Sequence, residues 1–260
     1  MEKNERDNNL EDIEEEEKKI DPTVKIPSKA NSHKLIVILE QCTLELTRTK
    51  KYPEIINGDD HIKIIRSMKK SPEEFRPDIT HQCLLSLFDS PLNKMGLLQV
   101  YIRTSNNILI EINPKTRIPR TYKRFSGLFT QLLLKNRIKA SDSEDTLLKV
   151  VNGNIKDLLK KGTPVVFLSD KGRVIDLDAY TESLGKAKNK NIAVVIGANG
   201  KGDIDNLIDY CDDIVSISSY ELTSSVTCAI CNLNMCNACC EEHNKKYNQF
   251  YPNFYNRSNH

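Results

Sequence analysis

The chain has 260 residues, of which 38% are apolar and 28% charged, and it contains no run of 18 apolar residues. A single packed core fits this length, and the absence of a long apolar run predicts no membrane span. Residues 1–21 carry ten acids and four bases, a net charge of −6, so the formal charge of +2 for the whole chain leaves +8 on the other 239 residues. An acidic tail on a basic body indicates a body that binds polyanions.

The first 32 residues are rich in Glu, Asn and Lys and nearly free of large apolar side chains. Such a segment buries too little surface to offset the entropy of ordering, which predicts a disordered acidic tail at 1–32. It also lacks the apolar stretch of a secretory signal. The eight cysteines of the chain are therefore expected to be free thiols rather than disulfides.

Six short apolar runs predict β-strands. The first, residues 35–39, contains no polar side chain, which indicates burial on both faces and a parallel sheet. Helical patterns lie between several of the runs, and strands that alternate with helices predict an α/β domain with a mostly parallel sheet flanked by helices. The other five runs are 97–102, 108–112, 165–168, 193–196 and 214–217.

A helix is predicted to begin at Asp78, directly after Pro77. An Asp in this position is a typical N-cap and stabilises a helix by about 1 kcal/mol. His81 falls on the first turn, where we expect a packing or hydrogen-bonding residue. The side chains that this helix should bury follow helical spacing: Ile79, Cys83, Leu84 and Leu87.

The clearest helical pattern covers about 120–136, with Pro119 in the first turn, where a helix tolerates proline. A third helix is predicted to begin at 141–145 and to end, directly or after a short successor, at Gly162. The apolar stripe of the helix at 120–136 consists of Phe125, Leu128, Phe129, Leu132 and Leu133.

No acid occurs at residues 112–141, although the stretch is rich in bases. Arg120 and Arg124 lie four residues apart, so on a helix they share a face, and Arg117 reaches the same side. Guanidinium groups on one face bind phosphates through bidentate contacts, and Tyr122 offers a ring for stacking on an unpaired base. A solvated helix face explains the same pattern, so the residues alone leave both interpretations open.

Two turns that follow apolar strands are candidate ligand-binding loops. The first spans 197–202 and contains three glycines, and the second spans 218–225 and is rich in serine. Glycines allow a backbone to approach a ligand closely, and ligands bind beyond the carboxyl ends of parallel strands. Tight turns without a ligand remain the alternative, since neither a P-loop nor a Gly-x-Gly-x-x-Gly fingerprint is present.

Three segments together carry a resemblance to a known family. They read RPDITHQCLL at 76–85, SPLNKMGLLQVY at 90–101 and NPKTRIPRTYKRF at 113–125. In amino-acid sequence and in their order along the chain, these segments resemble those of the SPOUT (α/β-knot) methyltransferases that methylate N1 of a pseudouridine in small-subunit ribosomal RNA. The resemblance covers about 34–230.

The resemblance implies a SPOUT domain at 33–235 with a C-terminal trefoil knot, followed by a Cys- and Asn-rich tail at 236–260. It also implies S-adenosyl-L-methionine as cofactor, small-subunit (18S-type) ribosomal RNA as substrate and a homodimer. Proteins of this family act in small-subunit biogenesis in the nucleus and nucleolus, which implies other small-subunit assembly factors as partners.

Residues that match the family's functional positions fall into three groups. Contacts to RNA are implied for Arg76, Arg117, Arg120 and Arg124. Arg76 and Asp78 are the candidate catalytic residues, with Asp78 accepting a proton or orienting the base. Cofactor binding is implied for Leu168, Ser169, Gly197, Gly202, Ile217, Ser218, Ser219, Tyr220, Glu221 and Leu222.

The chain departs from the family pattern at three places. Ser219 stands where the family has Asn or Asp, Glu221 where it has Pro, and the pair at 199–200 is smaller than usual. Because proline pre-sets a turn, Glu221 should leave its loop less rigid and weaken cofactor binding. The departures keep open an alternative, a non-catalytic RNA-binding assembly factor with the same fold.

The cysteine pairs Cys228/Cys231 and Cys236/Cys239, with Cys240 beside them, have the content of a zinc site. The four residues between the pairs are fewer than in a zinc ribbon or finger. Cys228 also matches a packing position of the family. We expect neutral thiols and no metal, with a C-terminal zinc module as the alternative.

Overall fold

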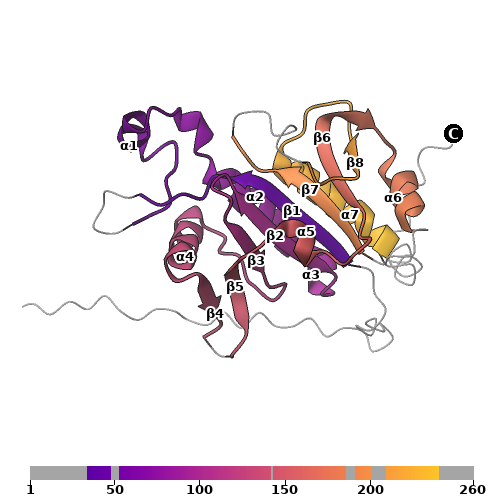
Figure 1. Cartoon of the computed structure of the whole chain (residues 1–260), viewed down its shortest axis with the longest axis horizontal. Coiled ribbons are helices and arrows are strands. Elements are labelled where there is room, and N and C mark those ends of the chain that lie inside the picture. The colour runs from indigo at the N-terminus through magenta and orange to yellow at the C-terminus, as the bar shows by residue number, and fades with distance from the viewer. Residues whose placement is uncertain (1–33, 48–52, 142, 186–190, 201–208, 240–260) are drawn as a thin grey trace, which may run out of the picture.

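The computed structural model describes residues 34–47, 53–141, 143–185, 191–200 and 209–239 (Figure 1). The predicted acidic tail at 1–32 lies outside the described residues, as does most of the predicted tail at 236–260. Among the described helices, none is long and apolar enough to cross a membrane.

The described strands form one mixed sheet in the order β4-β5-β3-β2-β1-β7-β6-β8. The half from β2 to β8 is parallel, whereas β2, β3, β5 and β4 pair antiparallel. All six predicted strands are present, which confirms the α/β class. The strands are β1 Lys34–Cys42, β2 Leu98–Thr104, β3 Leu109–Ile112, β4 Arg137–Lys139, β5 Thr146–Val151, β6 Val165–Val174, β7 Asn191–Gly197 and β8 Asp213–Ser216.

Burial on both faces of the central strands explains their unbroken apolar sequence. In β1, Leu35, Val37 and Leu39 join the core cluster on one face, and Ile36 and Ile38 join the cluster on the other. Successive side chains of a strand point to opposite faces, so a strand that is covered on both sides is mainly apolar.

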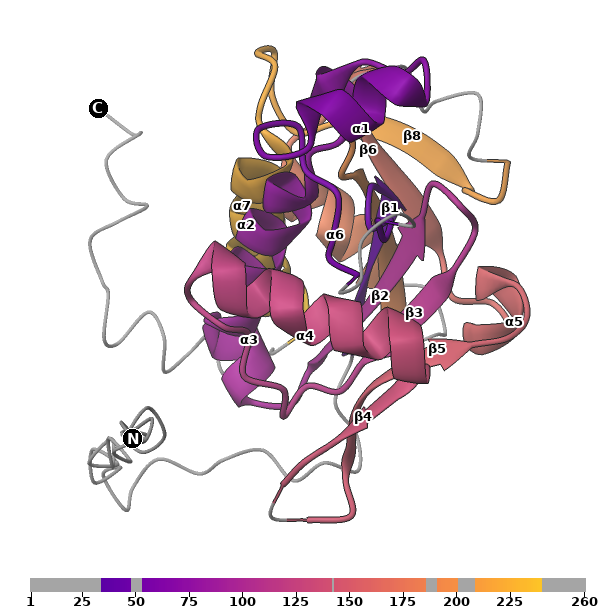
Figure 2. The same cartoon turned by 90° about the vertical axis from the view of Figure 1, so that its left-hand side faces the viewer.

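The helices are distributed unequally over the two faces. Figure 2 shows α2, α4 and α7 on one face and α5 on the other, and α7 packs against α2 and α6. The helices are α1 Ile62–Ser67, the 3-10 turn η1 Pro72–Glu74, α2 Pro77–Phe88, α3 Pro91–Lys94, α4 Tyr122–Lys135, α5 Ile155–Leu158, α6 Leu177–Gly185 and α7 Ser224–Cys239.

The start of α2 differs from the prediction. Arg76 is the N-cap, Pro77 is the first helical residue, and the Asp78 side chain pairs with Arg76 instead of capping the helix. Proline suits the first position because its missing N–H would have no partner there, and this moves the helix start one residue back. The prediction of Asp78 as N-cap is therefore wrong, although its charge still favours the helix N-terminus.

Helix α4 begins later than predicted, after the N-cap Thr121, so Pro119 and Arg120 precede it. It ends at Asn136, which adopts a left-handed conformation with φ +59°. The predicted stripe is largely confirmed, because Phe125, Phe129 and Leu132 are buried.

The helix predicted from 141–145 onward is wrong. Residues Thr146–Val151 form strand β5, which pairs with β3 and brings Leu148 opposite Ile112. The short helix α5 follows, and Gly162, with φ +84°, lies beyond its end. Long-range pairing with β3 overrides the weak local helical pattern.

The predicted trefoil knot involves the connection between β7 and β8. Residues 201–208 of this connection lie outside the described part of the chain. The knot therefore stays a prediction.

Candidate functional site

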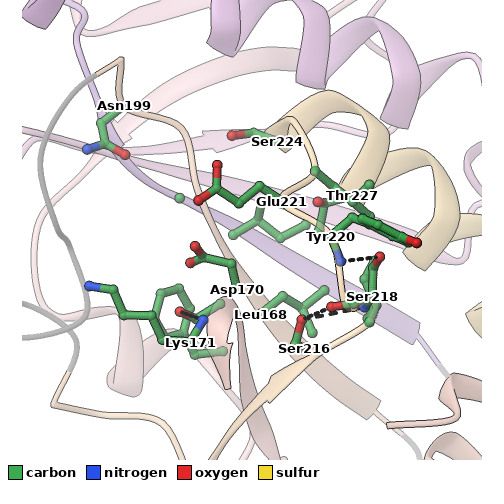
Figure 3. A pocket seen from close by; sticks show the side chains of 16 residues that line it. Leu168, Asp170, Lys171, Asn199, Ser216, Ser218, Tyr220, Glu221, Ser224 and Thr227 are labelled. Atoms are coloured by element: carbon green, nitrogen blue, oxygen red, sulfur yellow. Dashed lines mark hydrogen bonds between the residues drawn. The ribbon is translucent and has the colours of Figure 1, made fainter. Parts of the chain in front are cut away.

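A cavity of about 430 Å³ lies at the carboxyl ends of the parallel strands β6, β7 and β8 (Figure 3). It falls within the size range of small-molecule sites, roughly 300–1,000 Å³. The lining comes from the two loops that the sequence singled out, from a bulge in β6 and from the first turn of α7. Ligands bind at this edge of parallel sheets because strand ends there give way to loops.

The bulge in β6 creates one wall of the cavity. The pairing of β6 with β8 shifts between Leu168 and Arg173, so Ser169, Asp170 and Lys171 leave the ladder and line the cavity. The pairing with β8 resumes at Arg173, and at the preceding Gly172 an added Cβ would lie 2.5 Å from the carbonyl carbon of Val215. Only glycine allows this close approach of two backbones.

A chain of serine hydrogen bonds shapes the loop after β8. The Ser216 hydroxyl donates to the carbonyl oxygen of Ser218 at 2.7 Å, and the Tyr220 main-chain N–H donates to the Ser218 hydroxyl at 3.0 Å (Figure 3). These local bonds fix the turn in the absence of the proline that the related family carries at Glu221.

Most of the predicted cofactor residues meet in this cavity. Ser219 is exposed on the turn and lies outside the lining, and Gly202 falls outside the described residues. The predicted residues that line the cavity are Leu168, Ser169, Gly197, Ile217, Ser218, Tyr220, Glu221 and Leu222.

Sequence reasoning missed several polar residues of the lining. Figure 3 shows the carboxylates of Asp170 and Glu221 turned toward the same part of the cavity, so a cationic ligand group is favoured there. Asp170 and Lys171 follow the predicted strand 165–168 directly, a position that signals a strand-end loop. Ser224 and Thr227 carry no such signal, because only the first turn of α7 brings them to the cavity.

Arg76 is held by three contacts. Its Nε and Nη2 atoms donate to the two carboxylate oxygens of Asp78 at 2.9 and 2.7 Å, and its main-chain N–H donates to the Thr43 hydroxyl at 3.0 Å. The hydrogen bond to Asp78 raises the pKa of Arg76 above its ordinary value. With side chains 48% and 38% exposed, the pair adds little stability, so its effect is to orient the guanidinium.

The cavity and Arg76 are adjacent. The loop after β7 passes from Asn199, in the lining, to Gly200, whose added Cβ would lie 2.4 Å from the Arg76 Cγ. The backbone at Gly200 therefore packs directly on the arginine stem. Arg76, predicted to bind RNA, therefore lies next to the predicted cofactor loop.

Buried anchors hold the segment that carries Arg117 and Arg120. The His81 Nε2 atom lies 2.7 Å from the carbonyl oxygen of Pro119, so this nitrogen carries the proton and donates. The His81 ring stacks on Phe125 with centroids 4.5 Å apart. Both arginines remain exposed on this fixed segment. The prediction that His81 is a packing and hydrogen-bonding residue is confirmed.

The arginines do not share a helix face in the predicted way, because Arg120 lies before α4 and Arg124 lies within it. Arg120 instead forms an exposed ion pair with Asp89 at 3.2 Å, just beyond the end of α2. Arg124 is exposed, and Tyr122 is half-buried against Phe125. The arginine surface thus consists of Arg76 just before α2, Arg124 within α4, and Arg117 and Arg120 on the segment between residues 113 and 121.

The described cysteines belong to the core. Cys228 and Cys231 of α7 are buried and, like Cys42 and Cys83, free thiols. A hydrogen bond with Cys83 and burial raise the pKa of Cys228. The described residues contain no cluster of three ligands that fits a metal, and the side chains at 236–240 lie outside them.

The fold and the site define an α/β protein with a small-molecule cavity at its parallel strand ends and an arginine surface beside it. Residues 37–235 match the EMG1/NEP1 methyltransferase family. The chain therefore belongs to this family.

Named relatives support the assignment. The Drosophila melanogaster ribosomal RNA small subunit methyltransferase NEP1 is 43% identical over 208 residues, which cover 78% of this chain and 82% of that one. The human protein of the same name is 42% identical over 209 residues, covering 80% and 83%. Archaeoglobus fulgidus Nep1 bound to S-adenosylhomocysteine superposes with a TM-score of 0.58 at 27% identity, covering 78% of this chain and 96% of that one.

Proposed function

We propose that this chain transfers the methyl group of S-adenosylmethionine to N1 of a pseudouridine in small-subunit ribosomal RNA. Family membership makes the chain a methyltransferase, and its named relatives act on small-subunit ribosomal RNA. The observation that carries the proposal is the contact between Gly200 and Arg76, because it joins a cavity of cofactor size to an arginine that is predicted to bind RNA.

The residues of the cavity fit S-adenosylmethionine. The apolar walls Leu168, Ile217 and Leu222 suit the adenine ring, and the serine turn offers main-chain donors and acceptors. Asp170 and Glu221 suit the positive charges of the ligand. The solved relative with S-adenosylhomocysteine supports the same cofactor class. When bound, the cofactor supplies an electrophilic methyl group on a positively charged sulfur.

The protein has two chemical tasks. It must align N1 with the methyl carbon, which the arginine surface does by holding phosphates around a base swung out of its stack. It must also stabilise the negative charge that develops as N1 loses its proton. Arg76, oriented by Asp78, supplies that charge stabilisation. Asp78 is also the candidate acceptor of the proton.

The assembly and location of the protein are proposed on the same grounds. The family resemblance supports a homodimer that acts with other small-subunit assembly factors in the nucleus and nucleolus. Apolar side chains exposed on and next to α7 support a contact between two copies: Tyr220, Val226 and Leu233.

The test is methyl transfer from labelled S-adenosylmethionine to two RNA hairpins that differ only in pseudouridine or uridine at one loop position. Transfer to the pseudouridine hairpin alone is expected. Tight binding of both hairpins without transfer to either would support the non-catalytic assembly factor instead. Equal transfer to both would contradict N1 of pseudouridine as the acceptor.

A further inference from the structure

A buried carboxylate lies next to the cofactor cavity without lining it. Glu40, near the end of β1, has an exposed fraction of 0%. It lies on the sheet face of Ile36 and Ile38, which packs against α5 and Tyr210. A charge in such a place needs partners to offset the loss of water.

Two side chains from distant segments satisfy Glu40. The Tyr210 hydroxyl donates to Oε1, and the Arg103 Nε donates to Oε2 at 2.9 Å. The Arg103 guanidinium lies 5.3 Å from the centre of the Tyr210 ring, a cation–π distance. Burial and the Glu40 charge raise the pKa of Tyr210, so its hydroxyl stays a donor.

The main chain of Glu40 forms a second link to the same part of the protein. Its carbonyl oxygen accepts a hydrogen bond of 2.8 Å from the Ala198 N–H. Ala198 lies between Gly197 and Asn199, and both of these line the cavity. Ala198, directly after β7, and Tyr210, shortly before β8, are thus both bonded to Glu40.

We propose that Glu40 is a positioning residue for the cofactor, and that its paired contacts to Ala198 and Tyr210 set the cavity wall at Gly197 and Asn199. The inference rests on the proposed function and adds residues that do not touch the cofactor. Core stability alone gives little reason for a charge here, since apolar replacements of buried ion pairs are often neutral or stabilising.

Cofactor binding by Tyr210→Phe and Glu40→Gln tests the proposal. Tyr210→Phe removes only the hydroxyl, and loss of its hydrogen bond to a charged group should weaken S-adenosylhomocysteine binding about tenfold in calorimetry. In turnover assays the KM for S-adenosylmethionine should rise by a similar factor, with kcat changed less than about twofold. RNA hairpin affinity without cofactor should stay nearly the same, because Arg117, Arg120 and Arg124 lie on a different segment and because Thr43 and Asp78 hold Arg76 independently of this wall.

A matched control is Tyr180→Phe. The Tyr180 hydroxyl donates to Asp213 at 2.7 Å, and Asp213 also pairs with Arg173, so this triad likewise joins a tyrosine, a carboxylate and an arginine, away from the cavity lining. Loss of the Tyr180 hydroxyl should leave the affinity for the cofactor unchanged. Tyr210→Phe and Glu40→Gln should also be non-additive when combined, because they break the same contact.

Three outcomes would overturn the inference. The first is an unchanged cofactor affinity in both variants. The second is an equal weakening of cofactor binding and RNA binding together with a lower melting temperature, because this would indicate a general loss of stability. If the wild-type chain binds no S-adenosylhomocysteine, the proposed function is overturned together with this inference. If the wild-type chain binds it tightly and both variants bind it equally tightly, only this inference is overturned.

Discussion

At the scale of single residues, Glu221 is the most consequential departure from the family pattern. The sequence predicts only that a proline is missing from the turn. The structure adds that the carboxylate faces the cavity together with Asp170 (Figure 3). A negative charge there would attract the positively charged sulfur of a methyl donor and would not attract the neutral sulfur of the product.

Glu221→Gln should therefore reduce the preference for donor over product. Removing one partly exposed charge should weaken S-adenosylmethionine binding about threefold and leave S-adenosylhomocysteine binding unchanged. Calorimetric titration of both ligands measures this ratio. Glu144→Gln, which alters a 93% exposed side chain on another loop, serves as control. Equal weakening of both ligands would show that Glu221 acts on the loop and not on the sulfur.

Arg120→Ala should weaken RNA binding without changing cofactor binding. Loss of one phosphate contact should lower hairpin affinity and reduce the salt slope by about one unit. The exposed pair with Asp89 adds little stability, so the melting temperature should hold. Fluorescence anisotropy at several salt concentrations measures the slope. Arg137→Ala, an exposed arginine of β4 in the same basic stretch, is the control. If Arg120→Ala weakened RNA binding and cofactor binding equally, the prediction that Arg120 contacts the RNA would be contradicted.

Residue-level predictions succeeded where the local sequence determines the environment. His81 follows an apolar helix start, and it is buried against Phe125. The N-cap at Asp78 failed because a proline competes for the same turn. Asp170 was missed because a register shift places it in the cavity, and such a shift depends on a strand far away in sequence.

At the scale of elements, the bulge of β6 depends on one glycine. Gly172→Ala places a Cβ against the backbone of Val215. Neither β6 nor β8 can move aside to make room for it without breaking the hydrogen bonds between the two strands. We expect a loss of about 1–3 kcal/mol in the free energy of unfolding and weaker cofactor binding. Denaturant unfolding and calorimetry measure the two effects.

Gly127→Ala is the matched control, because an added Cβ at this α4 position meets nothing within 4 Å. Alanine in an exposed helix should leave stability unchanged or raise it slightly. If both alanine variants unfold at the same denaturant concentration, close backbone approach at Gly172 does not determine the bulge.

Strands buried on both faces were predictable, whereas the half-exposed strands β4 and β5 were not. Strand β1 contains the unbroken apolar run 35–39 and strand β7 the run 192–196, so their sequence alone indicates them. In β5 only Leu148 is buried, and β4 has no fully buried residue. Their pairing with β3 and with each other is long-range, and short half-exposed runs do not distinguish strand from helix.

At the scale of the whole molecule, α7 presents an apolar stripe to solvent. Val226 and Leu233 are 44% and 53% exposed and lie seven residues apart, on the same side of the helix. Because α7 also forms one side of the cavity, a second copy docked there would brace the cofactor site. Leu233→Glu should convert a dimer into a monomer in analytical ultracentrifugation.

The control for this change is Leu134→Glu, which alters a 57% exposed side chain on α4. It should leave the sedimentation coefficient unchanged. A dimer that survives Leu233→Glu, or one that dissociates equally in both variants, would place the interface elsewhere.

The contact of Gly200 with Arg76 also has a kinetic consequence. An RNA bound to Arg76 would lie against the loop at Gly200, which continues from the cavity wall at Asn199, so we expect the methyl donor to enter before the RNA and the spent donor to leave after it. The enzyme should therefore follow a compulsory order of addition. In steady-state kinetics, the spent donor should compete with the methyl donor at every RNA concentration, whereas methylated RNA should not.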